Sequence, residues 1–185
     1  MTVFIALLRG VNLASHNRMK MDRLRAVCES LALRDVQTYV QSGNIVFRSK
    51  ESDPRKMAAK LEKAIEAEFG FRPPVILRTT AEWKQAIARN PFAKRTGLNP
   101  ASLLVHFLAQ DPGHEAREKA RCVPAEEEEL HVFDNELYIY FPNGMARPKL
   151  KFAAVERALN VTGSGRNWNS VLKLLEMAER LEADE

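Results

Sequence analysis

The chain opens with a run of six apolar residues at positions 3–8, which predicts a strand buried on both faces of a sheet. Apolar residues then recur every three or four positions over residues 20–32, which is the spacing of an amphipathic helix. Two β-rich runs follow at residues 36–41 and 45–48. They flank Ser42-Gly43-Asn44, where the glycine favours a tight turn, so together they predict a hairpin.

A second helix is predicted to begin at Asp53-Pro54, because aspartate is a common helix cap and proline is favoured in the first turn. Apolar residues at positions 57, 61, 65 and 69 form its buried face, and Gly70 ends it. The run Val75–Leu77 predicts a fourth strand. Residues 1–79 therefore have the order β-α-β-β-α-β, which is the ferredoxin-like split βαβ arrangement.

Part of this pattern recurs after a short helix near residues 80–88, which Asn90-Pro91 stops. The next expected elements are a strand at 102–108, a helix at 115–121, a hairpin of runs 129–133 and 136–141, and a helix at 151–159. A glycine loop and a last helix at 168–181 then stand where a fourth strand is expected. The predicted fold is α+β, with two tandem ferredoxin-like halves and an extra C-terminal helix.

The expected division is a ferredoxin-like half at residues 1–79, a helical connector at 80–100, and a second α+β half at 101–185 that ends in a helix. A chain of 185 residues can also hold these parts as one compact domain. The duplication rests on the order of the elements, because the two halves share no residue-level repeat.

Composition narrows the class of protein. With 45% hydrophobic residues and only 17 Gly and Pro residues, the chain has the apolar surface to form a core. Its apolar runs are too short to span a bilayer, and its N-terminus lacks the pattern of a signal peptide. Cys28 and Cys122 fall in helix-like segments and are expected to be reduced residues in or near the core. We expect a cytoplasmic protein with no membrane partner.

The net charge of +4 is unevenly distributed. Residues 1–92 carry 16 Lys and Arg against 9 Asp and Glu, whereas residues 93–185 carry 12 against 15. A first half with a net charge of +7 favours anionic partners such as nucleotides, phosphate esters or nucleic acid. The alternative is that this excess only solvates the surface.

A first polar cluster follows the first strand directly. Arg9 stands at the strand end, and Gly10 allows a sharp turn or a close approach to a ligand. The donors that precede the helix, where backbone amides favour an anion, are Asn12, Ser15, Asn17 and Lys20. The cluster is placed like a phosphate-binding loop, between a strand and a helix. It has neither of the two glycine-rich nucleotide-binding signatures, G-x-x-x-x-G-K-S/T and G-x-G-x-x-G. The alternative is a scaffold in which the asparagines satisfy backbone groups.

The second cluster, Ser42, Gly43 and Asn44, has the residue types of an ordinary hairpin turn. It contributes to a binding site only if the turn lies beside Arg9 in space. We therefore predict that the clusters at Arg9, Ser42 and Arg166 converge.

The third cluster spans residues 163–169. Gly163 and Gly165 are expected to make the chain flexible here. Asn167 or Asn169 is expected to cap the last helix. A cation at a helix N-terminus opposes the macrodipole, so Arg166 is better explained by a bound anion than by helix stability. The apolar face of the helix is predicted from the spacing of Trp168, Val171, Leu172 and Leu175.

No catalytic residue is identified, and any cofactor is unknown. The four histidines are scattered, and none stands at metal-ligand spacing from Cys, Asp or Glu, so no metal site is expected. The short runs at residues 9–12, 41–44 and 163–169 contain no carboxylate or histidine that would serve as a general base.

These motifs resemble those of a bacterial family, the domain-of-unknown-function family numbered 1697, over nearly the whole chain. The resemblance rests on residues 6–12, 20–25, 38–44, 147–150 and 162–174. The family's Thr-x-Arg-Asn-Trp-Asn joint is longer by two residues here, where Thr162-Gly163-Ser164-Gly165 precedes Arg166. The resemblance implies an α+β fold of ferredoxin-like halves and supplies no activity, substrate or cofactor.

The sequence favours a protein that binds an anionic small molecule or nucleotide in a polar cleft between its halves. Charge-assisted hydrogen bonds from the two arginines would be the strongest contacts. The expected ligand-binding residues are Arg9, Gly10, Asn12, Lys20, Ser42, Gly43, Asn44, Arg166, Asn167 and Asn169. One alternative is a nucleic-acid-binding module that uses the basic first half, and another is an enzyme acting on a phosphorylated or carboxylated metabolite. The oligomeric state does not follow from the sequence.

Overall fold

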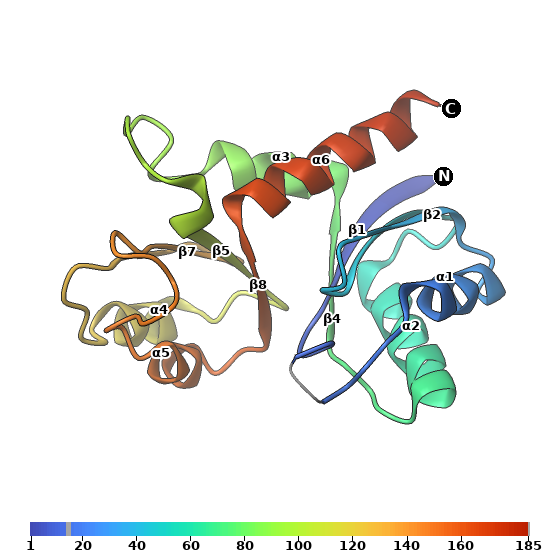
Figure 1. Cartoon of the computed structure of the whole chain (residues 1–185), viewed down its shortest axis with the longest axis horizontal. Helices are drawn as coiled ribbons and strands as arrows, with labels where there is room; N and C mark the ends of the chain where they lie inside the picture. The colour runs from blue at the N-terminus through green and yellow to red at the C-terminus, as the bar shows by residue number, and fades with distance from the viewer. Residues whose placement is uncertain (14–15, 185) are drawn as a thin grey trace. The chain divides into compact units, whose positions relative to one another are not determined.

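The computed structural model describes residues 1–13 and 16–184. The chain forms two compact units, the first made of residues 1–85 and 173–185 and the second of residues 86–172 (Figure 1). Within the described residues, two four-stranded antiparallel sheets and six α-helices make an α+β fold, as the sequence predicts.

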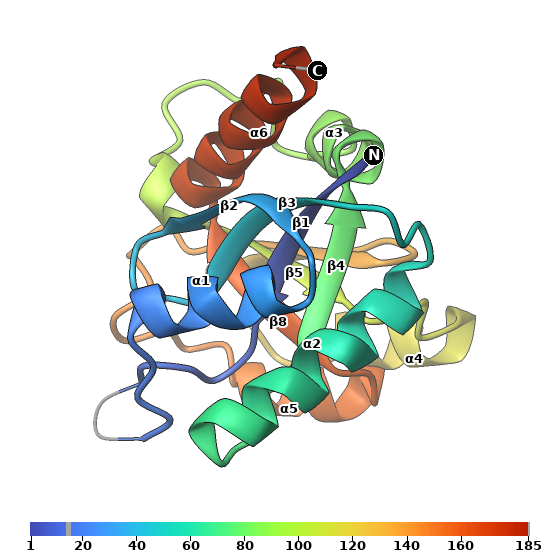
Figure 2. The same cartoon turned by 90° about the vertical axis from the view of Figure 1, so that its right-hand side faces the viewer.

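The first unit is built on a sheet with the strand order β2-β3-β1-β4. Its strands are β1 (Thr2–Leu8), β2 (Arg34–Tyr39), β3 (Asn44–Ser49) and β4 (Val75–Thr79). The helices α1 (Met21–Ser30) and α2 (Pro54–Phe69) cover one face of this sheet (Figure 2). The predicted order β-α-β-β-α-β of residues 1–79 is therefore confirmed.

Local sequence signals fix α2. The Asp53 carboxylate accepts hydrogen bonds from the backbone N–H groups of Arg55 and Lys56, and Pro54 occupies the first turn. Gly70 ends the helix in a left-handed conformation. The buried face of α2 includes Met57, Leu61 and Ile65, which pack with Phe4 and Phe47 of the sheet in one core.

The second unit repeats this plan on a sheet with the strand order β6-β7-β5-β8. Helix α3 (Thr80–Ala88) leads into it from the first unit, followed by a short 3-10 turn, η1 (Pro100–Ser102). The remaining elements are β5 (Leu103–Leu108), α4 (His114–Arg121), β6 (Glu129–Val132), β7 (Glu136–Tyr140), α5 (Phe152–Leu159) and β8 (Gly163–Asn167). Helices α4 and α5 lie side by side on one face of the sheet (Figures 1 and 2).

Strand β8 corrects the sequence prediction of a glycine loop at this position. Residues 163–167 pair antiparallel with β5, so that Gly165 lies opposite His106 and Arg166 opposite Val105. The composition Gly-Ser-Gly-Arg-Asn has little intrinsic preference for a strand. Pairing with the buried strand β5 overrides that local preference.

The last helix, α6 (Trp168–Ala183), was predicted to bury Trp168, Val171, Leu172 and Leu175. This prediction is wrong for Leu172, which is 44% exposed, and Trp168 and Leu175 are only partly buried. The residues of α6 that are fully or almost fully buried are Val171, Leu174, Met177, Ala178 and Leu181. Both cysteines are free, as expected, but Cys122 is exposed rather than in or near the core.

Candidate functional site

In the first unit, the N-terminal loop (residues 9–13 and 16–20) is joined to the turn formed by residues 40–44. The backbone N–H of Leu8 donates to the Gly43 carbonyl at 2.8 Å, so the end of β1 and the turn lie side by side. A Cβ atom on Gly43 would stand 2.6 Å from Val11 Cγ2 and 2.7 Å from Leu8 Cβ. Glycine is thus required here by close packing as well as by its φ of +71°. The structure brings the first two predicted clusters together.

Asn12 fastens the N-terminal loop to the turn. Its amide Nδ2 donates to the carbonyls of Met19 at 3.0 Å and Gln41 at 2.9 Å, while its Oδ1 accepts from the Met19 N–H at 2.7 Å. Both amide hydrogens are therefore used within the protein. This geometry matches the scaffold alternative for Asn12, because its donors hold backbone carbonyls of two separate segments.

The turn formed by residues 40–44 is also stabilised by hydrogen bonds from a buried side chain. Asn44 is fully buried, and its Nδ2 donates to the Tyr39 carbonyl at 3.0 Å and to Ser42 Oγ at 2.7 Å. Val40 has a φ of +49°, which is an outlier for a β-branched residue, and it is 55% exposed. Outliers of this kind persist where the surroundings enforce them and are common at ligand sites.

A pocket of about 500 Å³ opens beside the N-terminal loop, and we call it the basic pocket. It is lined by Asn12, Arg18, Met19, Lys20, Arg23, Gln41 and Phe69. Arg18 and Lys20 are exposed, and within residues 1–13 and 16–184 neither forms an ion pair or a hydrogen bond through its side chain. Two positive charges therefore line this pocket, and no carboxylate of the described residues neutralises them.

The third cation of the basic pocket is held differently. Arg23 donates through Nε to Glu68 Oε1 at 2.7 Å and through Nη2 to the Glu68 carbonyl at 3.3 Å. Its guanidinium carbon lies over the Phe69 ring, 5.1 Å from the centroid. Glu68 neutralises the charge of Arg23 and, together with the ring, fixes the orientation of its side chain.

The third predicted cluster belongs to the second unit. Arg166 lies on β8 rather than in a loop, and its Nη1 donates to Ser164 Oγ at 2.9 Å and to the Gly165 carbonyl at 2.7 Å. Burial lowers the pKa of this guanidinium to about 10, because the charged form loses hydration. Asn167 caps α6, since its Oδ1 accepts from the Ser170 N–H at 2.9 Å. Asn169 is exposed.

Of the ten residues predicted to bind a ligand, Asn12 and Lys20 line the basic pocket. Gly10 has a φ of +69° and provides the sharp turn after Arg9, while Ser42, Gly43 and Asn44 build the adjoining turn. Ser15 lies outside the described residues. The convergence of Arg9 and Ser42 with Arg166 concerns residues of different units and stays a prediction.

Sequence reasoning missed Arg18, Arg23 and Phe69. Arg18 and Arg23 flank Lys20 at a spacing of two and three residues, so a search for basic residues around the helix start would have found them. Phe69 has no such signal, because it joins the pocket only when α1 and α2 pack side by side.

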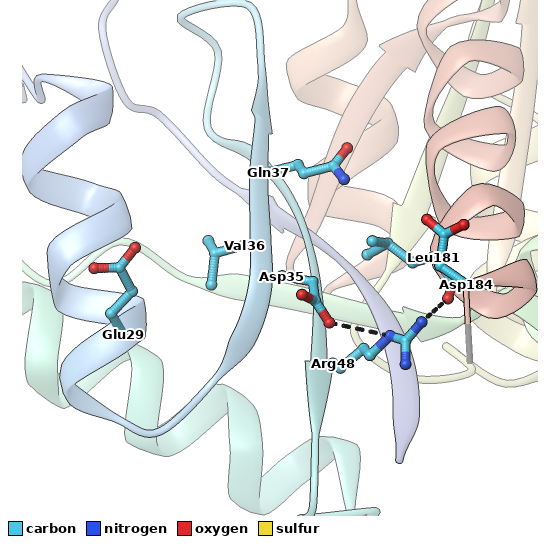
Figure 3. A pocket seen from close by; sticks show the side chains of 7 residues that line it. All are labelled: Glu29, Asp35, Val36, Gln37, Arg48, Leu181 and Asp184. Atoms are coloured by element: carbon cyan, nitrogen blue, oxygen red, sulfur yellow. Dashed lines mark hydrogen bonds and ion pairs between the residues drawn. The ribbon is translucent and has the colours of Figure 1, made fainter.

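A second pocket of the first unit, of about 460 Å³, lies where the end of α6 meets the edge of the sheet (Figure 3). Arg48 Nε is 3.3 Å from Asp35 Oδ2, and Arg48 Nη2 donates to the Leu181 carbonyl. A register irregularity in β2 gives Asp35 a φ of +52°, which directs its side chain to Arg48. The Arg48 side chain is only 10% exposed, so these contacts tie α6 to the sheet.

Two further findings concern the described residues. They contain no group of three or more His, Cys, Asp and Glu side chains placed to hold a metal ion. None of the helices within them is both long and apolar enough to cross a membrane.

The model of a protein family described as "Protein of unknown function (DUF1697)" matches residues 1–138. No curated protein matches the chain. A solved structure, described as that of the conserved bacterial protein SP0830 from Streptococcus pneumoniae, is similar at a TM-score of 0.71 and 20% identity. The similarity covers 96% of this chain and 98% of that one, and at this identity it concerns the fold alone.

Proposed function

The chain belongs to the DUF1697 family, whose function is unknown, and we propose that it binds an anionic small molecule or nucleotide in the basic pocket. The observation that carries the proposal is the pair of exposed cations, Arg18 and Lys20, for which the described residues supply no carboxylate partner. A volume of about 500 Å³ falls within the usual range for small-molecule pockets. Lys20 also stands at the N-cap of α1 without a side-chain cap, so the first amides of that helix add to the attraction for an anion.

Rigidity of the pocket wall supports the same proposal. Asn12 uses both hydrogens of its side-chain amide in hydrogen bonds that hold the pocket wall together. The contacts to the ligand would come from Arg18 and Lys20. A wall fixed by hydrogen bonds lowers the ordering cost of binding. The positive charge of residues 1–92 adds long-range attraction for an anion.

Calorimetric titration with inorganic phosphate and with nucleoside monophosphates tests the proposal. The double variant Arg18→Gln/Lys20→Gln should weaken binding by about tenfold to a hundredfold, because it removes two charge-assisted donors. Lys63→Gln is the matched control, since it changes an exposed lysine of α2 that does not line the pocket. The proposal fails if no anion binds, or if both variants weaken binding equally.

Nucleic-acid binding is the second candidate, favoured by the positive charge of the first half. The two candidates differ in their response to salt. Each neutralised phosphate adds about 0.7–0.9 to the slope of log affinity against log salt, so an oligonucleotide spanning many phosphates would give a steep slope. A slope of about two or less is expected for a ligand held by Arg18 and Lys20 alone.

We further propose that each unit is ferredoxin-like. The order β-α-β-β-α-β and the matching strand orders β2-β3-β1-β4 and β6-β7-β5-β8 support this description. A cytoplasmic location is also proposed, and the two free thiols, Cys28 and Cys122, support it.

A further inference from the structure

The basic pocket contains a flat surface beside its two available cations. The guanidinium of Arg23 is held by the Glu68 side chain and main-chain carbonyl, and it lies over the ring of Phe69. The Arg23 side chain nevertheless remains 56% exposed. A guanidinium is planar, and its exposed part offers a surface on which an aromatic ring can stack.

The charge of Arg23 is already balanced, and this separates its role from that of its neighbours. Glu68 Oε1 lies 2.7 Å from Arg23 Nε, so an incoming anion would compete with a carboxylate there. Arg18 and Lys20 present no such competition from the described residues. The pocket therefore combines an anion-binding part with a flat, nearly neutral part.

Gln41 adds a polar group of a different kind. Its side chain is exposed in the wall of the basic pocket, and within the described residues its amide makes no hydrogen bond. An amide offers both a donor and an acceptor, which suits the edge of a heterocyclic base. Neither an inorganic anion nor a simple sugar phosphate would use all three features.

We propose that the ligand of the basic pocket is a nucleotide, with its phosphate on Arg18 and Lys20 and its base stacked on the exposed face of Arg23. This inference rests on the proposed function and specifies its substrate class. The side chain of Gln41 contacts the edge of the base. The side-chain amide of Asn12 donates to the backbone carbonyl of Gln41 and so keeps this segment in place. Stacking on the fixed guanidinium makes the base contribute to affinity in addition to the phosphate.

Calorimetry with four probes tests the inference: AMP, ribose 5-phosphate, inorganic phosphate and adenosine. AMP should bind about tenfold more tightly than ribose 5-phosphate, because base stacking adds to the phosphate contacts. Adenosine should bind more weakly than AMP, since it lacks the phosphate. Equal affinity of AMP and ribose 5-phosphate would overturn the nucleotide inference while leaving the anion site intact, and absence of binding by every probe would overturn the proposed function itself.

Arg23→Lys separates stacking from charge, because lysine keeps the positive charge and loses the flat guanidinium. We expect the affinity for AMP to fall to that for ribose 5-phosphate, while the affinity for ribose 5-phosphate stays within about twofold. Arg72→Lys is the matched control, since Arg72 also pairs with a carboxylate of α2, Glu62, but lies outside the pocket. Gln41→Leu provides a second variant that leaves the Arg23 contacts in place. Unchanged AMP affinity in both Arg23→Lys and Gln41→Leu would overturn the inference.

Discussion

At the scale of single residues, His106 explains why β8 has a glycine at position 163. The imidazole is almost fully buried, and it lies with its ring 5.0 Å from that of Phe152 and with Nε2 3.5 Å from Glu156 Oε1. A Cβ on Gly163 would stand 2.3 Å from His106 Nε2 and 2.8 Å from the Phe107 carbonyl oxygen. A Cβ on Gly165 would be no closer than 3.1 Å to any neighbour. The two glycines thus differ in how strictly they are required.

Gly163→Ala should therefore lower the free energy of unfolding by about 1–3 kcal/mol, the usual cost of overpacking a filled interior. Gly165→Ala is the matched control and should cost clearly less, because small shifts of the Leu104 and His106 side chains can accommodate its methyl group. Urea denaturation of both variants measures the difference. Equal midpoints would contradict the view that His106 selects glycine at position 163.

At the scale of secondary-structure elements, the sequence predicts those whose signals are local. Asp53, Pro54 and Gly70 mark both ends of α2 through their own capping chemistry, so its bounds follow from the sequence. Strand β8 was missed because residues 163–167 lack strand-forming side chains and pair only in the presence of β5. The buried face of α6 was misassigned because helical spacing places Leu172 among apolar residues without showing which of them meet a core.

The residues of the candidate site also divide into those with a local sequence signal and those without one. Lys20 and the Ser42-Gly43-Asn44 turn were predicted, because a polar residue before a helix and a glycine between two strands are visible along the sequence. Arg23 and Phe69 are distant in sequence, and they meet only because α1 and α2 cover the same face of the sheet. The structural role of Asn12 was not predictable either, because it depends on where the Gln41 carbonyl lies in space.

Arg48 provides one of the contacts that hold α6 to the sheet of the first unit. Replacing Arg48 with Met should lower the free energy of unfolding by about 1–3 kcal/mol, because the Leu181 carbonyl loses its donor. Asp35→Asn should cost at most about 1 kcal/mol, since Asp35 is 53% exposed and its ion pair is screened by water. Hydrogen exchange of the amides in residues 173–183 provides the direct measurement. Unchanged protection in Arg48→Met would show that apolar packing alone holds the helix.

At the scale of the whole molecule, the two units share their connecting helices. Helix α3 begins in the first unit and ends in the second, and α6 begins in the second and continues into the first. Unfolding of one unit alone would shorten both helices, because each runs through the boundary between the units. Short helical segments are marginally stable on their own, so loss of one unit would destabilise the helical residues that belong to the other.

We accordingly expect the two units to unfold in one transition. Trp83 belongs to the first unit and Trp168 to the second, so variants that retain one tryptophan each report a different unit. The urea midpoints of Trp83→Phe and Trp168→Phe, followed by fluorescence and by circular dichroism in the same sample, should coincide within each variant. Two separate transitions within one variant would show that the units unfold independently.

The Arg48 contact has a consequence for synthesis of the chain. Residues 173–185 complete the first unit, yet a ribosome makes them only after all of residues 86–172. At translation rates of about 5–20 residues per second, the nascent first unit waits about 4 to 17 seconds for its final segment. During that interval Arg48 has not yet met the Leu181 carbonyl, and the first unit lacks the contact that ties α6 to its sheet. The first unit, which contains the N-terminal part of the chain, is thus completed after the second unit.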